Sequence, residues 1–292
     1  MDNRERAILK TLLYSNCFDY PLREEELYQF LINNQKIDKN VFYKLLQKVK
    51  KPISFNQGYY YLLGKEKFLK TRKQREKISL QKMQKAKNII SILGFIPTVQ
   101  LIGISGALAM KNSDVDDDID IFIISKNNFI WTTRFLTICL LILLGQYRNK
   151  NSKKYADKIC LNMLLDEKNI QLEKNLYIAH EISQLVPVLE RDNAYKKFIE
   201  QNKWVNQFMI NALDSNKNNK FLKKKGNIIE NQIINFLRLI HFEKITKFMQ
   251  LKYMQSTITK EVVKDGVLRL HPFDYGAYVL KFYNEQLKTF NL

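Results

Sequence analysis

Three short apolar segments, the second of them rich in β-branched residues, constrain the fold of this 292-residue chain more than any other feature. They cover Val99–Ile104, Ile119–Ile124 and Ile159–Leu165, and such runs are typical of buried strands. The stretch Phe129–Leu144, between the second and the third, is apolar and long enough for a helix. A strand–turn–strand–helix–strand order predicts a mixed α/β (α+β) fold in which helices pack on one central sheet.

The first 64 residues predict a small separate domain. Apolar residues recur at helical spacing in Arg6–Leu13, after Pro21, and after Asp38, which is placed to cap a third helix. Two apolar runs follow, and Asn56-Gln57-Gly58 separates them like a hairpin turn. Three helices and a hairpin are the order of a winged helix-turn-helix, whose third helix can enter a DNA groove. Such a domain can also serve only for protein contacts, and the sequence leaves both roles open.

The rest of the chain divides into three parts. Residues 65–97 predict a basic connector helix, in which Lys65–Lys87 contains ten basic residues and two glutamates. Such a density of charge can clamp a phosphate backbone or simply keep a connecting helix solvated. Residues 98–170 contain the expected sheet, and residues 171–292 predict a mainly helical region with one small hairpin.

The net charge favours polyanionic partners. The chain has 48 lysines and arginines against 29 acidic residues, a formal charge of +19. This excess favours RNA, DNA or nucleotide phosphates, whereas the alternative is a merely solvated lysine-rich surface. The three cysteines do not suggest a disulfide framework, which fits a reducing cytoplasm. Phe129–Leu144 is too short for a membrane span and contains Arg134, so we expect a core helix and no membrane partner.

Two carboxylates at the start of the second strand are the strongest candidates for chemistry. Residues two apart on a strand point to the same face, so Asp118 and Asp120 are expected to lie side by side. Neighbouring carboxylates repel one another unless a cation joins them, and Mg²⁺ or Mn²⁺ prefers such oxygen ligands. Upstream, Ser105, Gly106 and Ala107 form a turn after the first strand, where glycine lets the backbone approach a phosphate closely. The pattern indicates a site for a metal ion and a phosphate group.

This segment resembles the nucleotidyltransferase superfamily typified by DNA polymerase beta. Members have a Gly-Ser or Gly-Gly turn, then about a dozen residues, then Asp-x-Asp entering a strand, and here Gly106 lies 12 positions before Asp118. The resemblance covers about 25 residues directly and extends weakly to about residue 166. It implies a nucleoside triphosphate substrate held at Ser105, Gly106 and Ala107, and a divalent metal held by Asp118 and Asp120.

Two positions depart from that pattern. The turn serine of the family would fall at Ala107, so only Ser105 can supply a hydroxyl there. The family's third carboxylate lies on a later strand, and the third predicted strand here has Asn162 as its polar interior residue. Asparagine can be a metal ligand through its carbonyl oxygen, but it cannot act as a general base. Asp157 and Asp166, which flank the strand, are the alternatives.

The resemblance implies transfer of a nucleotidyl group from a nucleoside triphosphate to an acceptor hydroxyl, and the net charge favours an acceptor on nucleic acid. Ala107 and Asn162 keep open a second hypothesis, a nucleic-acid-binding regulator with a catalytically degenerate transferase fold. A third is nucleotidylation of a small molecule or a protein. Arg134 is expected either to contact the nucleotide's phosphates or to form a buried structural ion pair. His180-Glu181 has no second histidine at metal spacing and predicts an ordinary helix-surface pair.

Overall fold

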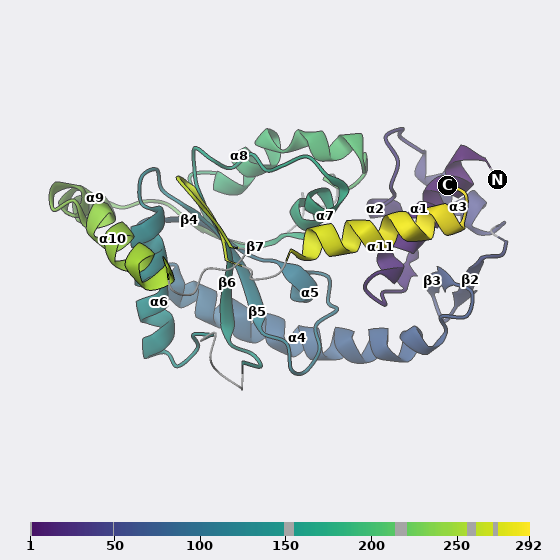
Figure 1. Ribbon diagram of the computed structural model, residues 1–292, viewed down its shortest axis with the longest axis horizontal. Helices are drawn as coiled ribbons and strands as arrows, with labels where there is room; N and C mark the ends of the chain where they lie inside the picture. Colours follow the sequence, from purple (N-terminus) through teal and green to yellow (C-terminus); the bar gives the residue numbers. More distant parts are fainter. Residues whose placement is uncertain (1, 49, 149–154, 214–220, 256–260, 271–273) are drawn as a thin grey trace.

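The structure is a computed structural model that describes residues 2–48, 50–148, 155–213, 221–255, 261–270 and 274–292. Within these ranges the chain forms eleven α-helices, one 3-10 helix and two β-sheets (Figure 1). The predicted mixed α/β fold class is therefore confirmed. Among the helices of the described ranges, none combines the length and the apolar character that a membrane span requires.

The first part of the chain forms a unit of three helices and three short strands. As predicted, Asp38 caps the third helix, because its side chain accepts hydrogen bonds from the amides of Asn40 and Val41. Gln57 and Gly58 have positive φ angles of 52° and 84°, which close the expected hairpin tightly. The elements are α1 (Asn3–Asn16), β1 (Leu22–Arg23), α2 (Glu24–Gln29), α3 (Lys39–Leu46), β2 (Ile53–Asn56) and β3 (Tyr59–Leu62), with the strand order β1-β3-β2.

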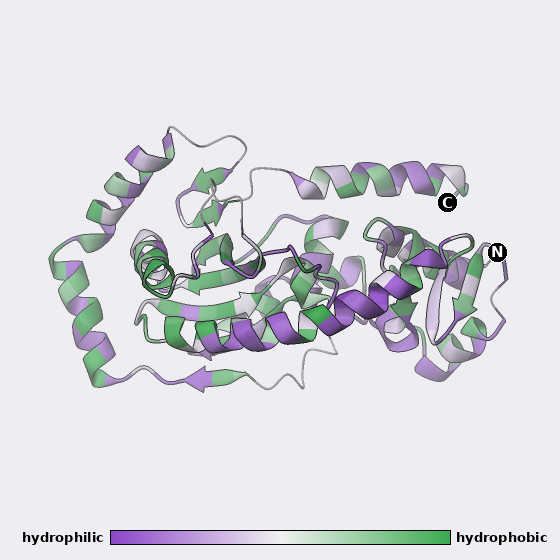
Figure 2. Ribbon diagram, turned by 90° about the horizontal axis from the view of Figure 1, so that it is seen from below, coloured by the Kyte–Doolittle hydropathy of each residue, from purple (hydrophilic) through white to green (hydrophobic). Residues whose placement is uncertain are grey.

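One long helix, α4 (Lys67–Leu93), leads from this unit to the large sheet and lies along one side of the molecule (Figure 1). Ala86, Ile90 and Leu93 are fully buried in the core that the helix shares with the sheet. Seen from below, the helix is mainly hydrophilic and the strands behind it are hydrophobic (Figure 2). The predicted connector helix is thus present, with one apolar stripe that anchors its second half.

Seven strands form the second sheet, in the order β8-β7-β4-β5-β6-β10-β9. The three predicted strands are its centre: β4 pairs with β5 antiparallel, and β5 pairs with β6 in parallel. The crossover between β5 and β6 contains α6 (Ile130–Leu143), as the apolar stretch predicted. The strands are β4 (Val99–Ile104), β5 (Ile119–Ser125), β6 (Ile159–Asp166), β7 (Val186–Arg191), β8 (Leu222–Lys224), β9 (Val262–Lys264) and β10 (Val267–Arg269).

The sheet extends into the part of the chain that was predicted to be mainly helical. Strands β7, β8, β9 and β10 all come from residues 171–292 and pair with one another or with strands from residues 98–170. A boundary at residue 170 therefore does not separate two units. The prediction missed β7 because Pro187 argues against a strand, but here Pro187 lies opposite Gly103, where the register shifts and a missing amide is tolerated.

Helices cover both faces of this sheet. On one face α7 (Leu176–Gln184), α8 (Ala194–Gln201) and the 3-10 helix Lys203–Gln207 share a core with β4, β5 and β6. On the other face α4, α6 and α10 (Phe242–Gln255) share a second hydrophobic core with the sheet. α10 is separated from α9 (Ile228–Leu239) at His241, whose φ of 52° interrupts the helical path.

The last helix, α11 (Tyr275–Thr289), connects the sheet back to the first unit. Its Val279 and Tyr283 are buried in the same core as residues of α1. The amide nitrogen Nδ2 of Asn16 donates a hydrogen bond of 2.9 Å to Oε1 of Gln286. The two ends of the chain therefore lie at the same end of the molecule (Figure 1).

Candidate active site

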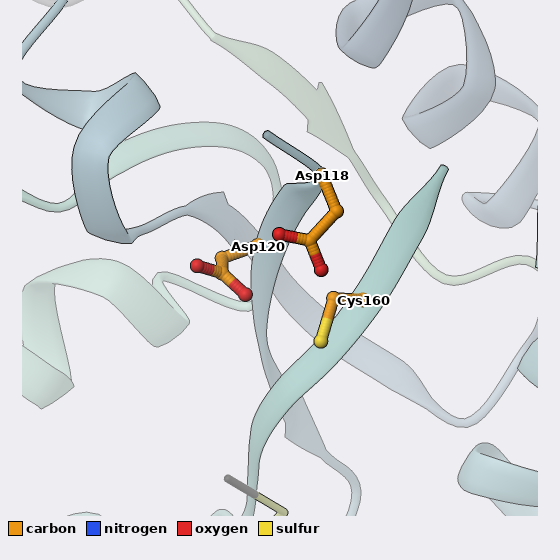
Figure 3. Close-up of side chains that lie close together, drawn as sticks. All are labelled: Asp118, Asp120 and Cys160. Carbon is orange, nitrogen blue, oxygen red and sulfur yellow. The ribbon is translucent and has the colours of Figure 1, made fainter. Parts of the chain in front are cut away.

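Strands β5 and β6 bring two carboxylates and a thiol together. Asp118 directly precedes β5, Asp120 is the second residue of β5, and the parallel register places Cys160 of β6 opposite Asp120. One ligand atom from each of these side chains lies within 4.8 Å of the other two. The three side chains surround one small space (Figure 3). The two aspartates thus lie together, as the sequence predicted, and the third side chain beside them is a cysteine.

Asn162 lies close by but in a different role from the predicted one. It falls where the register of β5 and β6 shifts, and its Nδ2 donates a hydrogen bond of 3.3 Å to Oγ of Ser105. Asn162 therefore orients the hydroxyl of the turn, whereas Cys160 has the position facing Asp120. The sequence prediction missed Cys160 because a cysteine within an apolar strand is typical of a core residue.

The turn after β4 lies directly against Asp120. The amide of Ser105 donates a hydrogen bond of 3.0 Å to the backbone carbonyl of Asp120. Gly106, the first residue of the short helix α5 (Gly106–Ala109), has a φ of +63°, and a Cβ atom there would lie 2.6 Å from Oδ2 of Asp120. Only glycine accommodates both the left-handed backbone and the adjacent carboxylate. Ala107 follows in the same turn and also lines the cavity described below.

The electrostatics of the pair match the expected repulsion between neighbouring carboxylates. Burial, and then the charge of Asp118, raise the pKa of Asp120 to about 7, while a hydrogen bond from Cys160 and the charge of Arg148 lower it. Arg148 supplies the positive charge at this point: its Nη1 lies 2.5 Å from Oδ2 of Asp118 and 3.2 Å from Sγ of Cys160. The prediction did not include Arg148, because it lies 30 residues from Asp118 in the chain.

Other residues named from the sequence have partners elsewhere. Arg134 is buried in α6, where its Nη1 donates to Oε1 of Gln250 in α10 at 2.5 Å. It is not among the described residues around the site, and its contact is structural, although with an amide rather than a carboxylate. Asp157 forms ion pairs with Lys82 and Lys85 of α4 at 3.2 and 3.6 Å.

Asp166 lies at the far end of β6 from Cys160. Its Oδ2 accepts a hydrogen bond of 2.6 Å from the amide of Asn128. Neither of the two aspartates that flank β6 therefore takes the position of a third carboxylate at the site.

A cavity of about 990 Å³ opens beside the two aspartates. Residues of α1, α5, β6, α7 and α11 line it, together with the acidic loop before β5. One of them is Glu181 of α7, and burial together with the charge of Asp120 raises the pKa of its carboxyl to about 7. The prediction of a helix-surface pair at His180-Glu181 is wrong, because His180 is only 7% exposed and both side chains line the cavity.

Comparison of the chain with protein-family models, with curated protein sequences and with solved structures yields no match. The two carboxylates are costly to ionise together, and a divalent cation between them would remove that cost. Because they lie beside a tight glycine turn and a large cavity, such a cation would be next to any ligand bound there.

Proposed function

We propose that the protein is a metal-dependent nucleotidyltransferase, which moves a nucleotidyl group from a nucleoside triphosphate to an acceptor hydroxyl. The observation that carries the proposal is the carboxylate pair of Asp118 and Asp120 with the Gly106 turn packed against it. This is the arrangement that the resemblance to the DNA polymerase beta superfamily implies. The order of elements in the first 64 residues also supports a winged-helix domain in front of the transferase fold.

The residues present fit a divalent cation. Asp120 keeps a raised pKa while Asp118 is its neighbour, and both carboxylates can ionise together once a cation joins them. Bound Mg²⁺ or Mn²⁺ would stabilise negative charge on the phosphate oxygens during transfer. Cys160 places a thiol where a carboxylate is expected, and burial raises the pKa of that thiol well above its ordinary value, so the two aspartates are the groups that would hold the cation.

Each protein group then has a separate task. Asp118 and Asp120 would hold the cation, and the missing Cβ of Gly106 lets the backbone of the turn lie directly against Asp120. Arg148 forms an ion pair with Asp118, and its guanidinium is a group that could also contact a bound phosphate. Asn162 fixes the orientation of the Ser105 hydroxyl through their hydrogen bond.

A second candidate function is a nucleic-acid-binding regulator whose transferase fold has lost catalysis. The observation that favours it is Cys160, because a thiol replaces the expected third carboxylate opposite Asp120. This candidate requires nucleic-acid binding that does not depend on either aspartate.

The test is transfer of label from each α-labelled nucleoside triphosphate, with Mg²⁺ or Mn²⁺, into RNA, DNA, protein and small hydroxyl compounds. In the Asp118→Asn/Asp120→Asn double variant we expect a loss of about 10³-fold or more, because the metal is no longer held. Asp116→Asn is the matched control, since this exposed residue of the same acidic loop lies outside the site. Absence of transfer from the unaltered protein, with salt-sensitive nucleic-acid binding in both proteins, would support the regulator instead.

A further inference from the structure

The cavity beside the candidate metal site has the opposite charge from the chain as a whole. Among the described residues that line it, six are acidic, two are arginines and none is lysine, although the chain has 48 basic residues. Arg148 is bound to Asp118, and Arg269 lies 3.5 Å from Glu173. Within the described part of the cavity, both arginines thus form ion pairs with carboxylates other than that of Glu181.

Aromatic rings form much of the remaining wall. Tyr14 and Phe18 belong to α1 or directly follow it, Tyr177 to α7 and Tyr275 to α11. The faces of such rings attract organic cations. One cation of the protein already makes this contact at the cavity, where the guanidinium carbon of Arg148 lies 5.1 Å from the ring centre of Tyr155.

His180 adds a polar atom that the described part of the protein leaves without a hydrogen-bond partner. Its ring stacks on Tyr14 with 3.9 Å between ring centres, and burial lowers its pKa to about 3, so the imidazole is neutral. The Nε2 atom of this buried side chain has no hydrogen-bond partner among the described residues. Because buried polar groups are nearly always hydrogen-bonded, this orphan atom indicates that a ligand or a water molecule binds in the cavity.

Glu181 is the cavity carboxylate that could recognise a positive charge without being part of the candidate metal site. It lies on α7, whereas Asp120 lies on β5, and Nε2 of Gln184 holds its Oε1 at 2.5 Å. The side chain of Glu181 is partly buried on the cavity wall, and burial, followed by the charge of Asp120, raises the pKa of its carboxyl to about 7, so a cation beside it would favour the ionised form. A metal-bound nucleoside triphosphate is itself anionic, so it does not supply that positive charge.

We propose that this cavity is the acceptor site and that its acceptor is a small organic cation that carries a hydroxyl group, such as an amino sugar or an amino alcohol. Glu181 is the counter-charge, and the aromatic rings of α1, α7 and α11 enclose the organic part. A cavity of about 990 Å³ suits a small molecule, since such sites measure roughly 300–1,000 Å³. A nucleic-acid end would instead bring phosphates against carboxylates, in a wall where no described residue is a lysine.

The inference that the acceptor carries a hydroxyl group rests on the proposed function, whereas the inference that it is positively charged does not. In the transfer, the acceptor oxygen forms a bond to the α-phosphorus and the bond from that phosphorus to the bridging oxygen breaks. The bridging oxygen keeps the electron pair and leaves with pyrophosphate, and the hydroxyl proton passes to water. No oxidant or other co-reactant is needed.

The test uses sets of three compounds that share one carbon skeleton, for example glucosamine, glucose and glucose 6-phosphate, together with an amino-alcohol set and an oligoribonucleotide. Calorimetric titration, with Mg²⁺ and a nucleoside triphosphate analogue that cannot react, measures binding, and label transfer measures reaction. We expect the cationic member of a set to bind at least about tenfold more tightly than the neutral one, and the phosphorylated member to bind most weakly.

Variants of Glu181 connect this preference to the cavity. Glu181→Gln should weaken binding of the cationic compound by at least about tenfold and leave the affinity for the neutral compound unchanged. Glu181→Asp keeps the negative charge and should keep the preference for the cation. Glu200→Gln, on the exposed side of α8, is the charge-matched control and should change nothing. Circular dichroism establishes that each variant is folded.

Two results separate this inference from the proposed function. Binding of cations that depends on Glu181, without label transfer to any acceptor, would overturn the transferase function but keep the cation site. Label transfer to the oligoribonucleotide that Glu181→Gln leaves unchanged, with no preference for cations in any set, would overturn the cation site and keep the transferase.

Discussion

The basic helix α4 and the acidic cavity differ in where their charges find partners. On α4, the basic residues that face the body are paired within the protein: Arg72 with Glu26 at 2.8 Å, Arg75 with Asp114, and Lys82 with Asp157. In the cavity, carboxylates gather from separate elements with only two arginines among the described residues of its wall. The inward charge of the helix is therefore structural, whereas the carboxylates of the cavity wall border an open space.

This difference shows that a net charge of +19 does not describe the site. Four of the ten basic residues in Lys65–Lys87 are bound to carboxylates of the protein. The outer residues of the helix remain for a polyanion, and these include the exposed lysines Lys67, Lys70, Lys73 and Lys77. A polyanion on this helix and a cation in the cavity are thus compatible.

The largest effect is expected from removing a structural charge of α4. Arg72→Met leaves Glu26 and the hydroxyl of Tyr20 without the buried guanidinium that donates to both, so we expect a loss of about 3 kcal/mol in the free energy of unfolding. Lys73→Met, on the adjacent exposed position, should change that free energy by less than about 0.5 kcal/mol. Urea unfolding followed by fluorescence measures both, and equal effects would contradict a structural role for the inward charges.

The second largest effect is expected at the glycine turn beside Asp120, on the wall of the cavity. Gly106→Ala introduces a Cβ atom 2.6 Å from Oδ2 of Asp120, so we expect at least about tenfold weaker binding of Mn²⁺ as well as some loss of stability. Gly58→Ala is the matched control, because Gly58 also has a positive φ but no heavy atom lies within 4 Å of the added carbon. Mn²⁺ binding by calorimetry should therefore change only in Gly106→Ala, and unchanged binding there would exclude Asp120 as a ligand.

A smaller effect is expected from pH. Asp120 and Glu181 have pKa values of about 7 in the folded protein, above those of ordinary carboxyls, so the native state binds more protons than the unfolded state between about pH 4 and pH 7. The free energy of unfolding of the metal-free protein should consequently fall as pH rises through this range. Mg²⁺ should then raise the melting temperature by roughly 2–5 °C more at pH 8 than at pH 5.5. The difference should disappear in Asp120→Asn, and its persistence there would place the metal elsewhere.

The smallest effect on catalysis is expected from the outer face of α4. Replacing Lys67, Lys70, Lys73 and Lys77 by glutamine should change label transfer to a cationic acceptor by less than about twofold, because these exposed side chains are not part of the cavity wall. If the same face binds nucleic acid, the salt dependence of that binding should fall by about one unit of slope for each phosphate that is no longer neutralised. A large decrease in transfer would instead show that the helix and the cavity hold one ligand.

Much of the fold was predictable because its elements carry local signals. Asp38 capped a helix as expected, and the three apolar runs became β4, β5 and β6 with nearly the predicted bounds. The strand β7 was not predictable, because Pro187 is acceptable only opposite the register shift at Gly103, which depends on the partner strand. The short strands β8, β9 and β10 likewise depend on pairing with segments far away in the chain.

Of the site, the sequence predicted the side chains that lie close together along the chain. Asp118, Asp120 and the Gly106 turn belong to one segment, and their spacing was informative. Cys160 depends on the parallel register between β5 and β6, which no local pattern reveals. Glu181 was misassigned to a helix surface, because its burial depends on α7 lying between the sheet and α11.

The packing of α11 has a consequence for how the protein is made. Residues 274–280 contribute to one wall of the cavity, and the helix is held against α1 by contacts such as that between Asn16 and Gln286, 270 positions apart. A ribosome that has released residues 99–166 has supplied both aspartates and Cys160, but it has not yet supplied that wall. The three side chains of the candidate metal site are therefore made well before the enclosed cavity can form, because one wall of the cavity comes from the last part of the described chain.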